Sequence, residues 1–124
     1  MSERQTKILV VEDEAVVLHT LKLILKQHGY EVRGARDGSE ALAAVEFQPD
    51  ILLCDINLPD MDGIQIALAL KYQLSHLGVV LLSGEITSAE LLQKAEDQGY
   101  HFEVLAKPAD PQVLLQVLAQ VGGG

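Results

Sequence analysis

Residues 51–63 read Ile51-Leu52-Leu53-Cys54-Asp55-Ile56-Asn57-Leu58-Pro59-Asp60-Met61-Asp62-Gly63, an apolar run followed by a cluster of turn-forming residues. The run is too short for a helix and rich in branched side chains, so it predicts a strand that is buried on both faces. It ends on a carboxylate, Asp55, and the residues after it favour a loop. Open α/β sheets place their chemistry at the carboxyl ends of such strands. Asp55 is therefore the candidate reactive residue.

Strand and helix patterns alternate along the rest of the chain. Short apolar runs predict strands at residues 7–11, 31–35, 51–55, 78–82 and 102–106. Apolar residues at three- and four-residue spacing predict helices at 15–27, from Asp37 until Pro49, and at 64–72, 88–98 and 110–121. Gly29 and Gly99 are expected to end helices, and Ser88 and Asp110 to cap them.

This alternation predicts an α/β fold, a doubly wound parallel sheet of five strands with helices on both faces. With 124 residues, the chain is expected to form a single domain, 1–124. Its folded core should cover about 6–121, and the glycines at 122–124 suggest a flexible tail. The strand at 31–35 is the most polar, which favours a position near a sheet edge.

Composition excludes several classes of function. The net charge of −9 argues against direct nucleic-acid binding, because phosphate contacts need clustered Lys and Arg. No apolar run approaches the roughly 20 residues of a membrane span, and the polar start is no signal peptide, so we expect a cytoplasmic protein without membrane contact. The single cysteine, Cys54, excludes an internal disulfide and is interpreted as a small buried hydrophobe.

Chemically useful side chains follow four of the predicted strands. Glu12 and Asp13 follow the first strand, and Asp55, Ser83 and Lys107 end three others. All carboxyl ends of a parallel sheet lie on one side, so these groups can converge on one pocket. Polar residues often appear where a strand reaches the surface, but that explanation does not easily cover acids, a hydroxyl and a lysine in succession.

Such a pocket suits phosphoryl transfer with a divalent cation. Carboxylates held a few ångströms apart cannot all stay ionised without a cation between them, and Mg²⁺ prefers oxygen ligands and phosphate. Lys107 offers a point charge for a phosphoryl oxygen, and Ser83 offers a hydroxyl donor. Asp55 can then attack phosphorus to form an aspartyl phosphate.

With these motifs in order, the chain resembles the receiver domain of bacterial two-component response regulators. The resemblance rests on Glu12-Asp13 after the first strand, the stretch from Asp55 to Gly63, Ser83-Gly84 and Lys107-Pro108, and it covers nearly the whole chain. It implies a flavodoxin-like (βα)5 fold with strand order 2-1-3-4-5. It also implies phosphorylation-dependent signalling, with a histidine kinase or phosphotransfer protein as the donor.

The resemblance assigns a role to each site residue. It makes Asp55 the phospho-acceptor and Asp13 a direct Mg²⁺ ligand. Glu12 would act on the metal mainly through water, and the backbone carbonyl of Asn57 would complete the protein ligands. Lys107 would pair with the phosphoryl group.

The resemblance also implies a switch. The bond between Lys107 and Pro108 would be cis, and Ser83 would move towards the phosphoryl group. The switch would bind a protein effector through the helix at 88–98, the strand at 102–106 and the helix at 110–121. Such a receiver is no enzyme beyond catalysing its own phosphorylation and dephosphorylation.

Some positions depart from the family pattern. Val104 stands where family members usually have an aromatic residue, although Tyr100 and Phe102 are nearby. Ala109 replaces a frequent phenylalanine after Lys-Pro, which changes packing and not chemistry. Asn57 and Glu85 occupy the positions that flank the attacking water, and their polar side chains predict a transient phosphoryl group.

Three alternatives stay open on the sequence alone. An aspartate-nucleophile phosphatase acting on small phosphate esters normally has a second aspartate where this chain has Asn57. A flavin or nucleotide binder would need a glycine-rich loop after the first strand, where Glu12, Asp13 and Glu14 would repel phosphate. A receiver-like module that is never phosphorylated would not need its acids, hydroxyl and lysine. Asp60 and Asp62 are interpreted as turn formers rather than metal ligands.

Overall fold

The computed structural model describes residues 5–84, 93, 96–97, 99 and 102–122. In this part of the chain a parallel five-stranded sheet has the order β2-β1-β3-β4-β5, which confirms the predicted fold class. The strands are β1 (Lys7–Val11), β2 (Glu31–Ala35), β3 (Ile51–Asp55), β4 (Gly78–Ser83) and β5 (Glu103–Ala106). The polar strand β2 lies at one edge of the sheet, as its sequence predicts.

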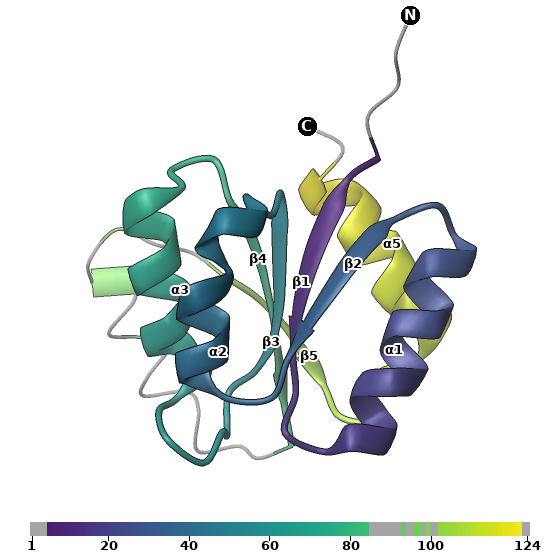
Figure 1. Cartoon of the computed structure of the whole chain (residues 1–124), viewed down its shortest axis with the longest axis horizontal. Coiled ribbons are helices and arrows are strands. Elements are labelled where there is room, and N and C mark those ends of the chain that lie inside the picture. The colour runs from purple at the N-terminus through teal and green to yellow at the C-terminus, as the bar shows by residue number, and fades with distance from the viewer. Residues whose placement is uncertain (1–4, 85–92, 94–95, 98, 100–101, 123–124) are drawn as a thin grey trace, which may run out of the picture.

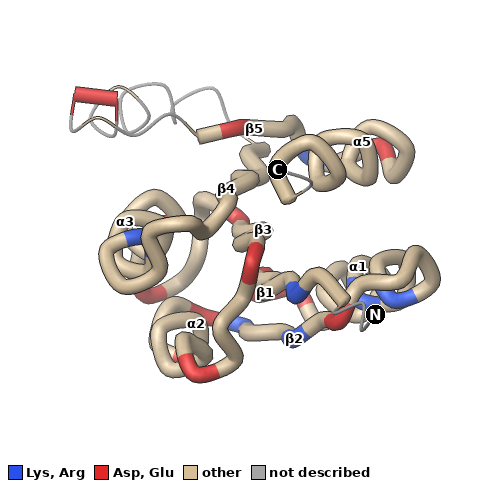
Figure 2. The backbone as a smooth tube through the Cα atoms, turned by 90° about the horizontal axis from the view of Figure 1, so that it is seen from above, with Lys and Arg blue, Asp and Glu red and all other residues tan. Residues whose placement is uncertain are grey.

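The helices cover both faces of the sheet. They are α1 (Ala15–Gln27), α2 (Gly38–Ala43) with the 3-10 helix η1 (Ala44–Phe47), α3 (Gly63–Gln73) and α5 (Pro111–Gly122). In Figure 1, α2 and α3 lie on one side of the sheet and α1 and α5 on the other, and Figure 2 shows the same layers from above. The predicted helix at 88–98 and its cap Ser88 lie largely outside the described residues.

Each layer of helices closes its own hydrophobic core. The sheet buries alternate residues towards each side, because successive side chains of a strand point to opposite faces. Leu52 of β3 belongs to the core under α2 and α3, whereas Leu53 belongs to the core under α1 and α5. All five residues of β3 are buried, as expected for the central strand of a doubly wound sheet.

Local signals fix the helix ends. Gly29 has a φ of 88°, and the amide of Tyr30 donates to the Leu25 carbonyl over 3.2 Å, so the predicted glycine cap of α1 is confirmed. Asp110 caps α5, because its Oδ1 accepts from the Gln112 amide at 2.8 Å.

Two element ends differ from the predicted ones. The helix expected to run until Pro49 tightens into η1 after Ala43, and Gln48 has a φ of 53°. Proline disfavours right-handed helical backbone in the residue before it, so no helix continues through Gln48 to Pro49. Gly122 is the last residue of α5 and not part of a tail: a Cβ there would lie 2.6 Å from Ile51 Cδ1. Residues 123–124 lie outside the described residues.

The sheet ladder continues beyond the strand ends and carries the site residues with it. The Glu12 amide donates to the Ala35 carbonyl at 3.0 Å, and the Lys107 amide donates to the Ser83 carbonyl at 3.0 Å. The Ile56 amide likewise donates to the Leu82 carbonyl at 2.9 Å. All these contacts lie at the carboxyl end of the sheet. In Figure 1 this is the end opposite to the start of β1.

Candidate functional site

Three acids meet at the carboxyl end of the sheet. Oxygen atoms of Glu12, Asp13 and Asp55 all lie within 4.8 Å of one another. Glu12 is 0% exposed and Asp55 is 3% exposed, whereas Asp13 is partly exposed. The convergence predicted from strand ends in separate parts of the sequence is therefore confirmed for these acids.

Lys107 joins the two buried acids. Its Nζ lies 2.9 Å from Asp55 Oδ2 and 3.0 Å from Glu12 Oε1. The peptide bond from Lys107 to Pro108 is cis, as the resemblance implied. A single ammonium thus faces two carboxylates, which leaves negative charge at the site for a further cation to neutralise.

Backbone amides hold the other carboxylate oxygens. The Asn57 amide donates to Asp55 Oδ1 at 3.0 Å, and the Glu14 amide donates to Glu12 Oε2 at 3.1 Å. Each buried carboxylate therefore has one oxygen on Lys107 and one on the main chain. This satisfies the rule that buried charges are paired and hydrogen-bonded.

Burial and pairing shift the protonation of this group. Burial raises the pKa of Glu12 above its usual value, although hydrogen bonds from Glu14 and Lys107 act in the opposite direction. Burial alone would lower the pKa of Lys107, but its hydrogen bonds to Asp55 and Glu12 outweigh burial and raise that pKa. Lys107 therefore keeps its charge at neutral pH.

Gly63 lets α3 approach the reactive residue. A Cβ at this position would lie 2.4 Å from the Asp55 carbonyl oxygen and 2.9 Å from Ile56 Cα, and the Gly63 amide donates to the Ile56 carbonyl at 2.8 Å. Asp62 caps α3 by accepting from the Gln65 amide at 2.9 Å, and the Gln65 side chain completes a capping box. The sequence predicts a turn former at Asp62; the structure makes it the N-cap of α3, outside the acid cluster.

The remaining predicted residues surround this centre. Ser83 is buried at the end of β4, where it pairs with Ala106, and its carbonyl holds the Lys107 amide. Asn57 is exposed beside Asp55. Glu85 and Tyr100 lie outside the described residues.

At the position where family members usually have an aromatic residue, this chain has a smaller apolar side chain. Val104 is partly buried in β5 and packs against the core under α2 and α3. Phe102 is itself a buried member of that core. Cys54 is also fully buried there, as its sequence position predicted, and burial raises the pKa of its thiol well above the usual value.

Sequence reasoning missed two residues near the site. The Arg36 guanidinium donates to the main-chain oxygen of Asp13, at 2.9 Å from Nη2 and 3.3 Å from Nε. Asp60 lies in a bend of the loop after β3, and its carboxylate accepts from the Gly38 and Ser39 amides. No local pattern marks Arg36, because its partner lies in another loop.

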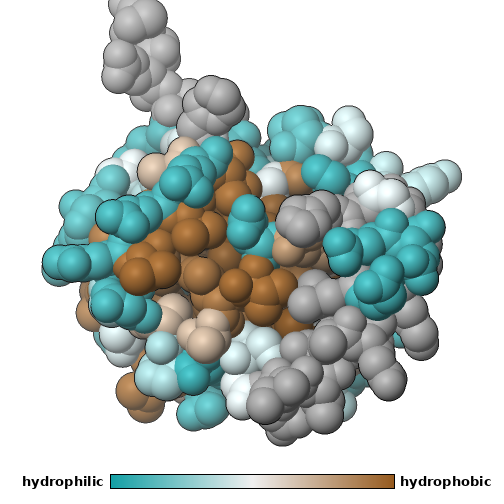
Figure 3. Space-filling model, turned by 180° about the vertical axis from the view of Figure 1, so that it is seen from behind, coloured by the Kyte–Doolittle hydropathy of each residue, from teal (hydrophilic) through white to brown (hydrophobic). Residues whose placement is uncertain are grey.

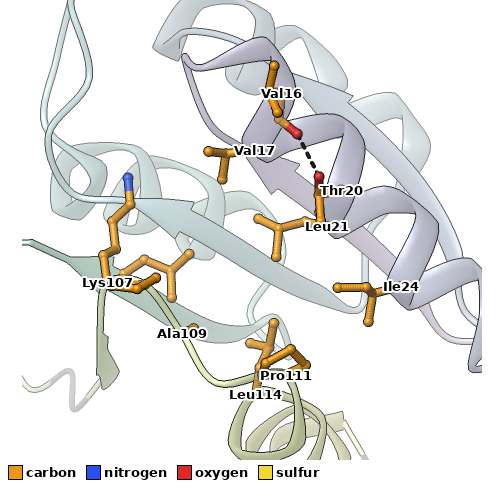
Figure 4. A pocket seen from close by; sticks show the side chains of 11 residues that line it. Val16, Val17, Thr20, Leu21, Ile24, Lys107, Ala109, Pro111 and Leu114 are labelled. Carbon is orange, nitrogen blue, oxygen red and sulfur yellow. Dashed lines mark hydrogen bonds between the residues drawn. The ribbon is translucent and has the colours of Figure 1, made fainter.

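An apolar pocket opens beside Lys107, between α1 and the start of α5 (Figure 4). It has a volume of about 460 Å³, and the aliphatic stem of Lys107 forms part of its wall. Val16 on α1 is 78% exposed at its edge. Apolar surface therefore adjoins the charged site on the α1 side.

The donor set fits Mg²⁺. Two buried carboxylates and a partly exposed one present oxygen atoms close together, and hard divalent cations take such ligands. Softer metals would call for thiolate or imidazole, whereas the acid cluster contains neither.

Comparison with known proteins agrees with this geometry. The response regulator receiver domain family matches residues 8–119. The chain belongs to this family. Residues 8–119 thus form a receiver domain of the kind that response regulators carry.

Individual relatives agree with this membership. The DNA-binding response regulator MtrA of Mycobacterium tuberculosis is 30% identical over 93% of the chain, which spans 50% of MtrA. The chemotaxis protein CheY4 of Vibrio cholerae is 33% identical, with a TM-score of 0.85 over 95% of this chain and 99% of that one. TrrA of Thermotoga maritima, solved in complex with Mg(2+)-BeF, is 25% identical, with a TM-score of 0.80 over 94% of this chain and 99% of that one.

The receiver covers only part of some relatives. The chain spans about half the length of MtrA, so the further activities of such proteins are not carried over to it. Among the residues that the structure describes, no helix has the length and apolar character that crossing a membrane requires.

Proposed function

We propose that Asp55 accepts a phosphoryl group from a histidine kinase or phosphotransfer protein. Glu12, Asp13, Asp55 and the backbone carbonyl of Asn57 would hold Mg²⁺. The observation that carries this proposal is the contact of Lys107 with both Asp55 and Glu12, inside a cluster of acids. The complex of TrrA with Mg(2+)-BeF supports the choice of metal.

The geometry prepares Asp55 as a nucleophile. Its carboxylate is fixed by Lys107 and the Asn57 amide, so it loses little orientational freedom when a donor arrives. An Asp55 oxygen forms a bond to phosphorus as the bond from phosphorus to the donor's imidazole nitrogen breaks and leaves its electron pair on nitrogen. Lys107 neutralises charge on the transferring oxygens. Mg²⁺, when bound, supplies the remaining positive charge.

The apolar surface beside the site suits a protein donor. Val16 and Lys107 both line the pocket between α1 and α5, so a donor helix with an apolar face can lie there while its histidine reaches Asp55. An effector would bind through the helix that the sequence predicts at 88–98, together with β5 and α5. Figure 3 shows apolar residues gathered on the face that carries α5, where Val113 is 44% exposed.

The receiver is expected to catalyse only its own phosphorylation and dephosphorylation. One acceptor then takes up about one phosphoryl group per chain, and a small ester such as p-nitrophenyl phosphate is not turned over.

The test is intact mass after incubation with Mg²⁺ and acetyl phosphate. We expect a gain of one phosphoryl group that requires Mg²⁺ and is lost in Asp55→Asn. Asp62→Asn is the matched control, because Asp62 lies in the same loop, outside the acid cluster, and asparagine also caps helices well. Absence of any gain in the wild-type protein, with Mg²⁺ binding shown separately, would contradict the proposal.

A further inference from the structure

We propose that residues 36–39, the brace, hold together the loop after β1, which carries Asp13, and the loop after β3, which carries Asn57, and thereby set the affinity of the site for Mg²⁺. The brace joins β2 to α2 and contacts the loop after β1 and the loop after β3. This inference rests on the proposed function, because it concerns the same metal site.

Arg36 holds the loop after β1. The amide of Glu12 still takes part in the sheet ladder, because it donates to the Ala35 carbonyl. Asp13 is therefore the first metal-binding residue beyond the sheet. The guanidinium donates to the main-chain oxygen of Asp13 through two nitrogen atoms. It therefore fixes the position of Asp13 while the carboxylate stays in the cluster with Glu12 and Asp55.

The brace is itself fixed to α2. Glu40 Oε1 accepts from the Arg36 amide at 2.9 Å, and Asp37 Oδ1 accepts from the Glu40 amide at 2.8 Å. These contacts form a cap at the start of α2. The Arg36 side chain therefore extends from a fixed backbone, and its guanidinium loses less conformational entropy when it binds Asp13.

The other end of the brace holds the loop after β3. Asp60 Oδ1 accepts from the Gly38 amide at 2.8 Å, and Oδ2 accepts from Ser39 at 3.1 Å from the amide and 3.3 Å from Oγ. Met61 packs over Gly38 so closely that a Cβ there would lie 2.3 Å from Met61 Cγ. These hydrogen bonds lower the pKa of Asp60, led by that from Gly38.

The two ends of the brace explain why it affects metal binding. Asp13 stands on one braced loop, and Asn57 stands on the other, between Asp55 at the end of β3 and Asp60. A metal ligand that is already positioned costs less ordering free energy on binding than a mobile one. Loosening either end should therefore weaken Mg²⁺ binding without changing the ligands themselves.

The test measures the Mg²⁺ affinity of Arg36→Lys, which keeps the charge but loses the two-pronged donor. Affinity is read by isothermal titration calorimetry and by displacement of Mn²⁺ in electron paramagnetic resonance. Arg33→Lys is the matched control, because Arg33 is an exposed arginine of β2 whose Cζ lies 4.9 Å from the centroid of the Phe47 ring. Gly38→Ala perturbs the other end of the brace without a change of charge.

We expect the Mg²⁺ dissociation constant to rise about threefold to tenfold in Arg36→Lys, the effect of losing one or two hydrogen bonds. It should rise in Gly38→Ala as well, because the added Cβ would displace Met61 and with it the loop after β3. Arg33→Lys should bind like the wild-type protein. At saturating Mg²⁺ the phosphorylation rates should differ by less than about twofold, because the reacting groups are intact.

Equal Mg²⁺ affinity in Arg36→Lys and Arg33→Lys would overturn the brace. That result differs from failure of the proposed function, in which the wild-type protein itself does not bind Mg²⁺ or become phosphorylated. A fall in phosphorylation rate that persists at saturating Mg²⁺ would likewise overturn it, since the brace is proposed to act through metal affinity alone.

Discussion

The two ends of the sheet are built on opposite principles. At the carboxyl end, β3 finishes on Asp55, and two buried carboxylates share the ammonium of Lys107. At the amino end, β3 begins on Ile51, which packs against Gly122, and Gly78 packs against Val121. The amino end gains stability from close apolar contact, whereas the carboxyl end keeps unbalanced charge that prepares it for a cation and a phosphoryl group.

Removing the ammonium should have the largest effect on function. In Lys107→Ala we expect the rate of phosphorylation by acetyl phosphate to fall about a hundredfold, the usual cost of losing one group that stabilises transition-state charge. The variant should also be less stable without Mg²⁺, because Glu12 and Asp55 then face each other without a cation, and Mg²⁺ should restore part of that stability.

The control for Lys107 is a lysine at the other end of the sheet. Lys71 Nζ donates to the Leu77 carbonyl, far from the acids. Lys71→Ala should leave the phosphorylation rate unchanged. An equal fall of the phosphorylation rate in Lys107→Ala and Lys71→Ala would contradict the contrast between the two ends of the sheet.

The next prediction concerns Gly63→Ala at the carboxyl end. The added Cβ would meet the backbone of Asp55, which no side-chain movement relieves. We expect a loss of about 3 kcal/mol in the free energy of unfolding, at the upper end for overpacking, together with slower phosphorylation. Urea unfolding and the mass assay measure the two effects, and a stable variant with normal phosphorylation would contradict the close approach.

Gly78→Ala is the matching change at the amino end. Here the Cβ would lie 2.2 Å from Val121 Cγ1, a side-chain atom. We expect a loss of about 1–2 kcal/mol of stability and an unchanged phosphorylation rate. Val121→Ala should relieve the clash, so that the double variant is more stable than the two single losses predict. Additive losses would show that the strain lies elsewhere.

The smallest expected effect concerns Asp60, near the carboxyl end of the sheet, and is measured as a dependence of stability on pH. The pKa of Asp60 is lowered from 3.8 by the amides of Gly38 and Ser39, so its ionised form stabilises the folded state. This contribution is present above pH 3.8 and is lost as the pH falls through the lower, folded pKa. Asp60→Asn should therefore be slightly less stable at neutral pH and equal to the wild type in strong acid. A difference that does not depend on pH would exclude the charge as its cause.

Most of the fold was predictable because its signals are local. Short apolar runs placed every described strand within about a residue of its observed bounds. The α2 region was less predictable: its last part is the 3-10 helix η1, which the apolar spacing does not reveal, and Pro49 disfavours right-handed helical backbone at Gln48. The end of α5 was also missed, because Gly122 is held by contact with Ile51, which the local sequence does not reveal.

The candidate site divides in the same way. The sequence by itself determined which groups the site contains, since Glu12, Asp13, Asp55, Ser83 and Lys107 each end or follow a strand and parallel strands bring their carboxyl ends to one side. Only the tertiary structure decided how these groups are paired: that Lys107 bridges Glu12 and Asp55, and that Arg36 and Asp60 connect separate loops. Periodicity is a property of neighbouring residues, whereas these pairings depend on where distant loops meet in space.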